Sequence, residues 1–280
     1  MTGKLVICAT PIGNLGDASP RLLEALRSAD LIAAEDTRRT LNLLRHFGIS
    51  TKVQSYHQHS TQHKHEALLH LLSLGKTVAL VSDAGTPGIS DPGEELIRDA
   101  INEGAAVTII PGPMAGIAAL VVSGLPTGRF AFEGFLPRGK RERRKVLSSL
   151  QNEARSLIFY EAPHRLKDTL CDMLEAWGDR RAALVRELTK TYEEVKRGTL
   201  SELLNFVEAN EARGEMVLVI AGNDSPAIAL EETVPPERLL RSLLEQGHSP
   251  AQAVRRAAKQ CKVPREELYQ LAISLSAQEE

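Results

Sequence analysis

Short apolar runs alternate with amphipathic helical patterns over the first 125 residues. The apolar runs predict strands at residues 5–9, 31–34, 77–81 and 106–110. The amphipathic patterns predict helices at residues 20–29, 37–47, 64–74, 94–103 and 115–123. Ser19 and Pro20 are typical of a helix start, and Gly48, Gly75 and Gly104 are typical of positions just past a helix end. This alternation with short connections predicts a mainly parallel sheet covered by helices on both faces.

A second α/β unit is predicted after the turn at residues 125–128. Its strand candidates are residues 130–135, 157–160, 182–185, 192–196 and 216–221. Its clearer helices are residues 166–177 and 200–209. Because no helical pattern separates Val185 from Lys196, two strands follow each other directly, and the sheet is predicted to be mixed.

The last part of the chain has the pattern of a small helical bundle. Residues 223–236 are polar and contain prolines, which predicts a linker. Helices are predicted at residues 237–246, 250–260 and 264–274, with a turn at Lys262 and Val263. This spacing fits a helix-turn-helix, and it fits a dimerisation element equally well. The predicted fold class is therefore α/β, with domains at residues 1–124 and 125–224 and a helical extension at residues 237–280.

Composition is that of a globular protein outside the membrane. Of the 280 residues, 42% are hydrophobic and 25% are charged. No apolar run has the length that spans a bilayer, and the N-terminus lacks a signal-peptide layout. Cys8, Cys171 and Cys261 are odd in number, widely spaced and without a CxxC pair. They predict reduced thiols in a cytoplasmic protein without structural zinc.

Charge is uneven along a chain whose net charge is −2. That net charge argues against a protein that coats nucleic acid over its whole surface. Residues 138–145 nevertheless hold six basic residues against one acid, and residues 237–271 hold seven against four. Both runs fit an RNA-facing patch, and both equally fit solvated surface.

Three loops rich in glycine and proline follow predicted strands: ATPIGNLGD at residues 9–17, SDAGTPGISDPG at 82–93 and PGPMAG at 111–116. Ligands of open α/β sheets bind outside the carboxyl ends of the strands, and glycine lets the backbone approach them closely. Three such loops at one edge predict a ligand crevice. No GxGxxG motif follows the first strand, and His70 stands where a P-loop needs glycine, which disfavours dinucleotide enzymes and P-loop NTPases.

Eight motifs occur in an order that resembles one protein family. They are ATPIGNLGD, AAEDTRRT, VSDAGTPGISDPG, PGPMAG, FEGFLPR, IFYEAPHR, RELTKTYEE and GEMVLVIAG, and the match that they carry covers roughly residues 4–222. The chain resembles the ribosomal RNA small-subunit methyltransferase I branch of the tetrapyrrole methylase superfamily, and the C-terminal segment resembles that branch's extension. The resemblance implies S-adenosyl-L-methionine in a cleft between two α/β domains, a homodimer, and 2′-O-methylation of a cytidine in the decoding region of 16S rRNA within the 30S subunit.

The cofactor pocket is expected in the predicted loops and in neighbouring strand ends. A sulfonium donor needs no metal, and an apolar pocket lined by carbonyl groups suits it. Met114 stands where the branch commonly has serine or cysteine, so contacts there are expected from the backbone. The residues expected at the cofactor are Pro11, Gly13, Ser82, Asp83, Ala84, Thr86, Pro113, Met114, Ala115, Phe159, Tyr160, Glu215 and Met216.

Catalytic candidates are polar residues that follow three strands. A ribose 2′-hydroxyl is a weak acid, so it needs a base or a cation that stabilises the developing alkoxide. Lys190 ranks first, Asp36 second and His164 third, with Glu187 and Glu35 beside them. A lysine acts as a base only if burial lowers its pKa, and otherwise stabilises the alkoxide as a cation. The alternatives are a helix N-cap for Asp36, a capping or packing role for His164, and a surface ion pair for Glu187 with Lys190.

Candidates for binding the RNA substrate are basic. They are Arg38, Arg165, Arg141, Arg143, Arg144 and Lys145. Arg38 and Arg165 fit a phosphate or a carboxylate of the protein itself. A histidine cluster, His57, His59, His63 and His65, fits metal ligation, RNA contact or a solvated loop, and the last two are favoured because no acid or cysteine completes a metal site. With aromatics at 4%, no aromatic platform for single-stranded RNA is expected.

Two other functions fit parts of the sequence. One is carbon methylation of a tetrapyrrole such as a precorrin, which the basic run and the added helical segment disfavour. The other is a non-catalytic RNA-binding assembly factor with a vestigial crevice. Intact polar loops around Asp36, His164 and Lys190 disfavour that reading.

Overall fold

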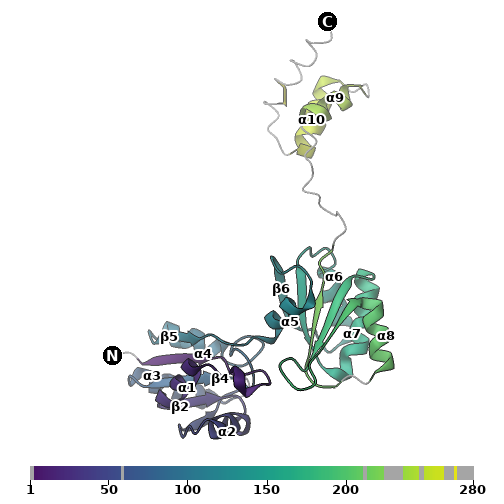
Figure 1. Ribbon diagram of the computed structural model, residues 1–280. Helices are drawn as coiled ribbons and strands as arrows, with labels where there is room; N and C mark the ends of the chain where they lie inside the picture. Colours follow the sequence, from purple (N-terminus) through teal and green to yellow (C-terminus); the bar gives the residue numbers. More distant parts are fainter. Residues whose placement is uncertain are drawn as a thin grey trace. The chain divides into compact units, whose positions relative to one another are not determined.

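The chain consists of two compact units in a computed structural model, Met1–Asn223 and Asp224–Glu280 (Figure 1). The structure describes residues 3–57, 60–210, 213–223, 236–245, 249–261 and 268–269. The first unit contains two five-stranded sheets. In these described ranges, no helix has the length and apolarity needed to cross a membrane.

The first sheet is entirely parallel, as predicted. Its strands are β1 (Lys4–Cys8), β2 (Leu31–Ala34), β3 (Val53–Ser55), β4 (Thr77–Val81) and β5 (Ala106–Ile110), in the order β3-β2-β4-β1-β5. Strand β3 was not predicted, because three half-buried residues are too few to show a period. Parallel pairing places the carboxyl ends of all five strands, and the loops that follow them, at one edge.

Helices cover both faces of the first sheet. They are α1 (Pro20–Ser28), α2 (Thr37–His46), α3 (Gln62–Ser73) and α4 (Glu94–Asn102). Helices α1 and α2 pack on one face and α3 and α4 on the other, each over a separate apolar cluster. Ser19 caps α1 by accepting a hydrogen bond from the Leu22 N–H at 3.1 Å, and Gly48, just past α2, has φ of +61°. The predicted caps are therefore confirmed.

The second sheet is mixed, as predicted. Its strands are β6 (Phe130–Phe135), β7 (Ser156–Glu161), β8 (Arg181–Arg186), β9 (Glu194–Thr199) and β10 (Met216–Ile220), in the order β6-β7-β10-β8-β9. Strands β6 and β7 are parallel, and the remaining pairs are antiparallel. Because β10 runs against β7 and β8, its first residue, Met216, lies at the edge where those strands end.

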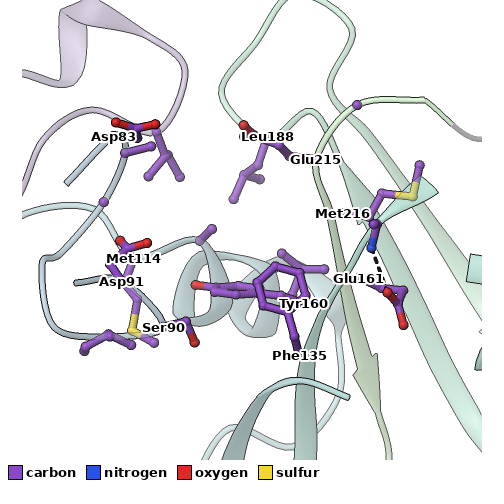
Figure 2. A pocket seen from close by; sticks show the side chains of 18 of the residues that line it. Asp83, Ser90, Asp91, Met114, Phe135, Tyr160, Glu161, Leu188, Glu215 and Met216 are labelled. Atoms are coloured by element: carbon purple, nitrogen blue, oxygen red, sulfur yellow. Dashed lines mark hydrogen bonds between the residues drawn. The ribbon is translucent and has the colours of Figure 1, made fainter. Parts of the chain in front are cut away.

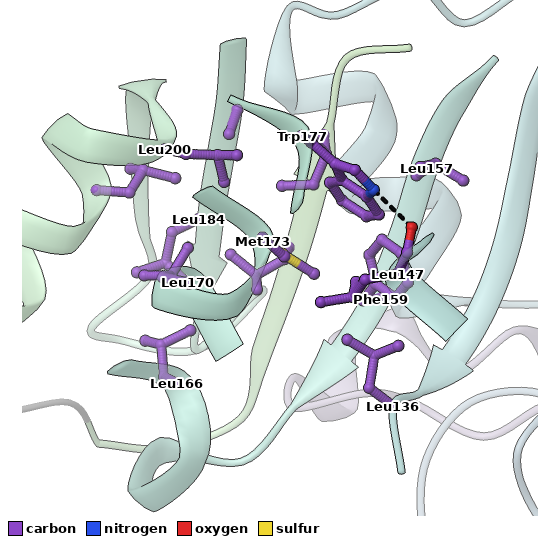
Figure 3. Close-up of a cluster of buried hydrophobic side chains, with 14 of the residues drawn as sticks. Leu136, Leu147, Leu157, Phe159, Leu166, Leu170, Met173, Trp177, Leu184 and Leu200 are labelled. Carbon is purple, nitrogen blue, oxygen red and sulfur yellow. Dashed lines mark hydrogen bonds between the residues drawn. The ribbon is translucent and has the colours of Figure 1, made fainter. Parts of the chain in front are cut away.

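Helices α6 (Lys140–Ser149), α7 (Pro163–Trp177) and α8 (Leu200–Ala209) cover one face of this sheet. Figure 3 shows the apolar cluster beneath them, where the Trp177 indole N–H donates to the Leu147 carbonyl oxygen at 2.8 Å. Helix α8 begins with a capping box made by Thr199 and Glu202. The basic run at residues 138–145, for which the sequence predicted no helix, forms much of α6.

Helix α5 (Ala115–Ser123) corrects the predicted boundary at residues 124–125. The sequence placed this helix with the first sheet. In the structure its buried residues Ala119 and Leu120 pack with Ile158, Val185 and Val219 of the second sheet, and Figure 1 shows α5 beside that sheet. By packing, the first sheet's part of the chain therefore ends in the loop before Ala115.

The second unit contains two described helices, α9 (Pro236–Glu245) and α10 (Pro250–Cys261). They pack through a small apolar cluster that includes Leu240, Val254 and Leu268. Both helices were predicted. The predicted linker, the turn at residues 262–263 and nearly all of the third helix lie outside the described residues.

Candidate active site

A cavity of about 420 Å³ is lined by residues from both sheets of the first unit. Figure 2 shows Asp83, Asp91 and Met114 on one side and Leu188 and Met216 on the other. The first side comes from loops that follow parallel strands, and the second from the ends of β7 and β8 and the start of β10. The ligand crevice predicted from the three loops therefore exists as a cavity. Of the residues predicted at the cofactor, those that line it are Asp83, Ala84, Thr86, Met114, Ala115, Tyr160, Glu215 and Met216.

Phe159 does not line the cavity, and its predicted contact with the cofactor is wrong. Successive side chains of a strand point to opposite faces. Tyr160 faces the cavity, whereas Phe159 is fully buried in the apolar cluster under α6, α7 and α8, with its ring centroid 6.0 Å from that of Trp177. The apolar run of β7 gave no signal for choosing between the two faces.

Other residues predicted at the cofactor stabilise the loops that form the cavity wall. The Thr86 hydroxyl donates to the Pro113 carbonyl oxygen at 3.1 Å, and the Ser82 hydroxyl donates to the Ala84 carbonyl oxygen at 3.3 Å. Pro11 and Ser82 line a smaller neighbouring cavity. Gly13 contacts Lys190. Four of the residues predicted at the cofactor therefore do not line the main cavity: Pro11, Gly13, Ser82 and Pro113.

Five carboxyl groups line the cavity: Glu35, Asp83, Asp91, Glu161 and Glu215. The loops are tied together, because the Asp83 N–H donates to Glu35 Oε2 at 3.2 Å and the Asp36 N–H donates to Asp83 Oδ1 at 2.9 Å. Burial raises the pKa of Glu35. Burial, reinforced by the charges of Glu35 and Asp83, raises the pKa of Asp91 to about 6. A cavity with this many acids favours a ligand that carries positive charge.

Sequence reasoning missed Asp91 and Arg39 in this wall. Arg39 lines the cavity, with its Nε 3.5 Å from Asp83 Oδ2. Both residues lie within motifs that the sequence analysis used. The signal that could have found them is position, because each follows a strand of the parallel sheet within a few residues of a predicted site residue.

We expect replacement of Asp91 by asparagine to stabilise the ligand-free chain above pH 6 by about 1–2 kcal/mol. A folded-state pKa of about 6 lies above the value of an unfolded aspartate. The wild-type chain therefore loses stability as pH rises from about 4 to 6, and the asparagine variant does not. The melting temperatures of both chains between pH 4 and 8 measure this difference. A difference that is the same at every pH would contradict the expectation.

Lys190 lies in a network of two carboxylates at the cavity's edge. Its Nζ is 3.0 Å from Glu187 Oε1 and 3.3 Å from Oε2 of Glu215, which lines the cavity. Glu187 Oε1 also accepts the Glu215 N–H at 3.0 Å. Partial burial opposes the charge of Lys190, but the two carboxylates outweigh it and raise its pKa. Of the two roles predicted for Lys190, the structure therefore supports the cation and not the base.

Two glycines make room for this network. A Cβ atom at Gly13 would lie 2.6 Å from Lys190 Cγ, and one at Gly214 would lie 2.1 Å from Glu187 Oε1. Gly214 also has φ of +81°, which favours glycine. Glu187 and Thr189 adopt positive φ values of 52° and 66° without being glycine. Such backbone costs free energy and is concentrated at functional sites, so this loop is held by its surroundings.

Asp36 is an N-cap and not a cavity residue. Its Oδ1 accepts the Arg38 N–H at 2.8 Å at the start of α2, and its Oδ2 lies 2.7 Å from the Arg38 guanidinium. These interactions with Arg38 lower the pKa of Asp36 to about 2, so its carboxylate is a poor base. The capping alternative is therefore confirmed, and the catalytic role predicted second is not supported. Arg38 is paired within the protein, with an exposed side chain that extends into solvent.

His164 and Arg165 differ from their predicted roles. His164 is exposed near the start of α7 and lies outside the main cavity, beside Lys167 and Asn210 in an open surface hollow. This position does not support the catalytic role predicted for His164. Arg165 binds inward: its guanidinium donates to the Leu136 carbonyl oxygen at 2.7 Å, and its Nε lies 3.4 Å from Glu161 Oε1. The alternative prediction for Arg165, that it binds a carboxylate of the protein itself, is confirmed.

The four predicted phosphate contacts of α6 lie on two faces. Arg143 is buried, with its side chain 5% exposed, and its guanidinium binds Asp172 at 2.6 Å. It cannot reach RNA, so that prediction is wrong. Arg144 binds Asp172 and Glu175. Arg141 and Lys145 are four residues apart on the exposed face.

Part of the histidine cluster is structural. Buried His65 lies between the Tyr56 hydroxyl, 2.9 Å from Nδ1, and Asp99 Oδ2, 3.1 Å from Nε2. His59 lies outside the described residues. Within the described ranges, no three histidine, cysteine or carboxylate side chains group closely enough to hold a metal ion.

Comparison with known proteins gives two family matches. Residues 4–204 match the model of the Tetrapyrrole (Corrin/Porphyrin) Methylases, and residues 231–276 match the RsmI C-terminal HTH domain. The second match supports the helix-turn-helix alternative for the end of the chain. Among solved structures, the fold is similar to a cobalt precorrin-4 methyltransferase (TM-score 0.59, 17% identity, 78% of this chain and 94% of that chain) and to a diphthine synthase (0.60, 17%, 79% and 90%).

Curated relatives extend over nearly the whole chain. The proteins called ribosomal RNA small subunit methyltransferase I are 50% identical in Synechocystis sp. (98% of this chain, 99% of that one), 46% in Halalkalibacterium halodurans (96%, 94%) and 42% in Bacillus subtilis (95%, 93%). The family predicted from the eight motifs is thereby confirmed. The chain is a methyltransferase that belongs to the tetrapyrrole (corrin/porphyrin) methylase family, in the group of ribosomal RNA small subunit methyltransferase I.

Proposed function

We propose that this methyltransferase uses S-adenosyl-L-methionine to methylate the 2′-hydroxyl of a cytidine in the decoding region of 16S rRNA. The substrate is the 30S subunit, and the enzyme acts in the cytoplasm as a homodimer. The names of the near-full-length relatives support ribosomal RNA of the small subunit as the acceptor. The resemblance of the eight motifs supports the ribose oxygen.

The observation that carries the proposal is the acidic and apolar cavity between the two sheets. Its volume of about 420 Å³ lies in the range of sites for one small ligand. S-adenosylmethionine, when bound, supplies a methyl group from a positively charged sulfonium. Glu35, Asp83 and Asp91 provide the negative potential for such a ligand, while Met114 and Leu188 provide apolar surface. At Gly85, φ of +82° lets the loop backbone form the wall where a side chain would strain it.

Lys190 has the role of a fixed cation. Its carboxylate partners keep it protonated, so it stabilises negative charge as the 2′-hydroxyl loses its proton. Another group must accept that proton. We assign this task to Glu35, because it lines the cavity and burial raises its pKa, which makes it a stronger base than an exposed glutamate. Glu187 holds Lys190 and is a positioning residue.

The exposed face of α6 supports contact with RNA. Arg141 and Lys145 are exposed, unlike the buried Arg143–Asp172 pair, so both charges are accessible to phosphates. A homodimer is supported by the outer edge of β5, which pairs with β1 alone among the described strands. Ile101 of α4 and Ile109 of β5 are exposed there beside an apolar hollow. The mass of the purified chain in solution tests the dimer.

We expect the purified chain to transfer label from methyl-labelled S-adenosylmethionine to 30S subunits that lack the modification. The labelled ribose should resist alkaline cleavage, because a 2′-O-methyl group removes the hydroxyl that attacks the neighbouring phosphate. Deproteinised 16S rRNA and a precorrin serve as parallel acceptors. Label on a base would overturn the ribose assignment. Label on the precorrin alone would favour carbon methylation of a tetrapyrrole, and no transfer to any acceptor would favour the assembly factor.

A further inference from the structure

A β-bulge changes the direction of Phe135 at the end of β6. Phe132 pairs with Ile158 and Gly134 with Phe159, so Glu133 is the extra residue. Strict alternation from Phe132 would point Phe135 into the apolar cluster beneath α6 and α7. The bulge instead pairs it with Tyr160 on the cavity side.

The bulge depends on Gly134. This residue has φ of +61°, and a Cβ atom there would lie 3.0 Å from the Ser90 hydroxyl oxygen. Leu136, which follows Phe135, then enters the apolar cluster and is buried. The local backbone therefore places the Phe135 ring outside the apolar cluster and the Leu136 side chain within it. Bulges of this kind occur next to active sites, where they redirect a side chain.

Phe135 lies at the exposed rim of the cavity. Its side chain lines the cavity, yet the residue is 55% exposed. Its ring centroid lies 5.5 Å from that of the half-buried Tyr160, whose hydroxyl accepts the Gly116 N–H at 3.2 Å. Figure 2 shows the two rings next to each other, across from Asp91 and Met114. Tyr160 thus fixes the inner side of Phe135 and leaves its outer side free for a ligand.

We propose that Phe135 is the platform on which the base of the acceptor nucleotide stacks, an inference that rests on the proposed methylation of a ribose in rRNA. We expect the acceptor nucleotide to leave its stack, because its ribose oxygen must reach a donor held inside a cavity. The displaced base then needs a new flat partner, and an exposed aromatic ring provides one for any base. The low content of aromatic residues argued against such a platform, but one correctly placed ring suffices.

The base that stacks on Phe135 could be the adenine of the donor or the base of the acceptor nucleotide. The volume of the cavity favours the acceptor. A volume of about 420 Å³ is near the lower end of the range for one small ligand. The donor occupies that space in the proposed function, so the acceptor nucleotide approaches from outside. Among the described residues that line the cavity, the exposed large apolar side chains are Phe135 and Ile89, and Phe135 alone of these two is aromatic.

Replacing Phe135 by alanine should raise KM for 30S subunits about 5- to 100-fold. The dissociation constant of S-adenosylhomocysteine, measured by calorimetry without RNA, should stay within about twofold. Phe135→Tyr should retain the wild-type KM, whereas Phe135→Leu, which is apolar but not aromatic, should not. The matched control is Phe130→Ala, because Phe130 is a partly exposed phenylalanine at the other end of the same strand and does not line the cavity.

A spectroscopic arm separates the two sources of the base. The chain has one tryptophan, the buried Trp177, so Phe135→Trp adds a reporter at the rim. Its fluorescence should be quenched by 30S subunits and not by S-adenosylhomocysteine. Quenching by the latter, or a parallel loss of its affinity in Phe135→Ala, would assign the ring to the donor and overturn the proposal. The proposal would also be overturned if Phe135→Ala had the same KM as Phe130→Ala, or if its mass in solution differed from that of the wild-type chain. Failure of the wild-type chain to methylate any ribose would instead refute the proposed function.

Discussion

Replacing Lys190 by methionine is expected to lower turnover on 30S subunits about 100- to 1,000-fold. Methionine keeps an unbranched side chain, one atom shorter than that of lysine, and removes its charge, so the alkoxide loses the cation that stabilises it. The side chain binds Glu187 and Glu215, and its own atoms do not line the donor's cavity. Affinity for S-adenosylhomocysteine should therefore stay within about twofold. Single-turnover rates and calorimetry measure the two quantities separately.

The control for this variant is Lys167→Met. Lys167 also pairs with a glutamate, Glu208 at 2.9 Å, but lies on α7 outside the main cavity, so its loss should leave turnover unchanged. Lys190→Arg keeps the charge and should recover part of the rate. Because its partners raise the pKa of Lys190, the wild-type rate should not fall between pH 7 and 9 through loss of this charge. An unaltered rate in Lys190→Met would remove the residue from the mechanism.

Replacing Asp172 by alanine should destabilise the chain by about 3–5 kcal/mol. The Asp172 carboxylate is 3% exposed and binds the Arg143 guanidinium, 5% exposed, at 2.6 Å. It also binds Arg144 Nε at 2.8 Å. Alanine would leave the Arg143 charge buried without its partner, which costs far more than loss of an exposed ion pair. Urea denaturation of the wild-type and variant chains gives the difference.

The matched control is Glu175→Ala. Glu175 binds Arg144 from the solvent side and is 64% exposed, so its removal should cost less than about 1 kcal/mol. Asp172→Leu combined with Arg143→Met should recover much of the stability, since it removes both buried charges. Although burial opposes it, the two arginines lower the pKa of Asp172. The pair's contribution is therefore present above the pKa of an unfolded aspartate and is lost as pH falls through the lowered folded value. Equal costs for Asp172→Ala and Glu175→Ala would contradict this account.

Local sequence signals were sufficient for most of the fold. The Ser19 cap and the glycine after α2 act within a few residues, so their effect is visible in the sequence. The parallel direction of the strands in the first sheet follows from alternation alone, whereas their order does not. The predictions that failed concerned elements whose packing partners are distant in the sequence. Helix α6 looked like an exposed basic run because its apolar contacts, such as Leu147, are brought together by the second sheet. The sheet on which α5 packs was likewise not encoded in its own pattern.

The candidate site was predictable at the level of loops and much less so at the level of side chains. Position at or next to a strand end identified Asp83, Tyr160 and Glu215 as residues near the cavity. The face of a strand could not be read from a uniformly apolar run, so Phe159 was misplaced. The direction of Phe135 required the bulge at Gly134, which interrupts the period that sequence reasoning assumes.

The order of the second sheet governs when the cavity can exist during synthesis. Strand β10 is the last strand of the first unit in sequence, yet it lies between β7 and β8. A nascent chain that ended before Met216 would have β6 with β7 and β8 with β9 as separate ladders. It would also lack Met216 and Val217 from the cavity wall. We therefore expect the cavity to be completed late, when the central strand leaves the ribosome and joins both ladders.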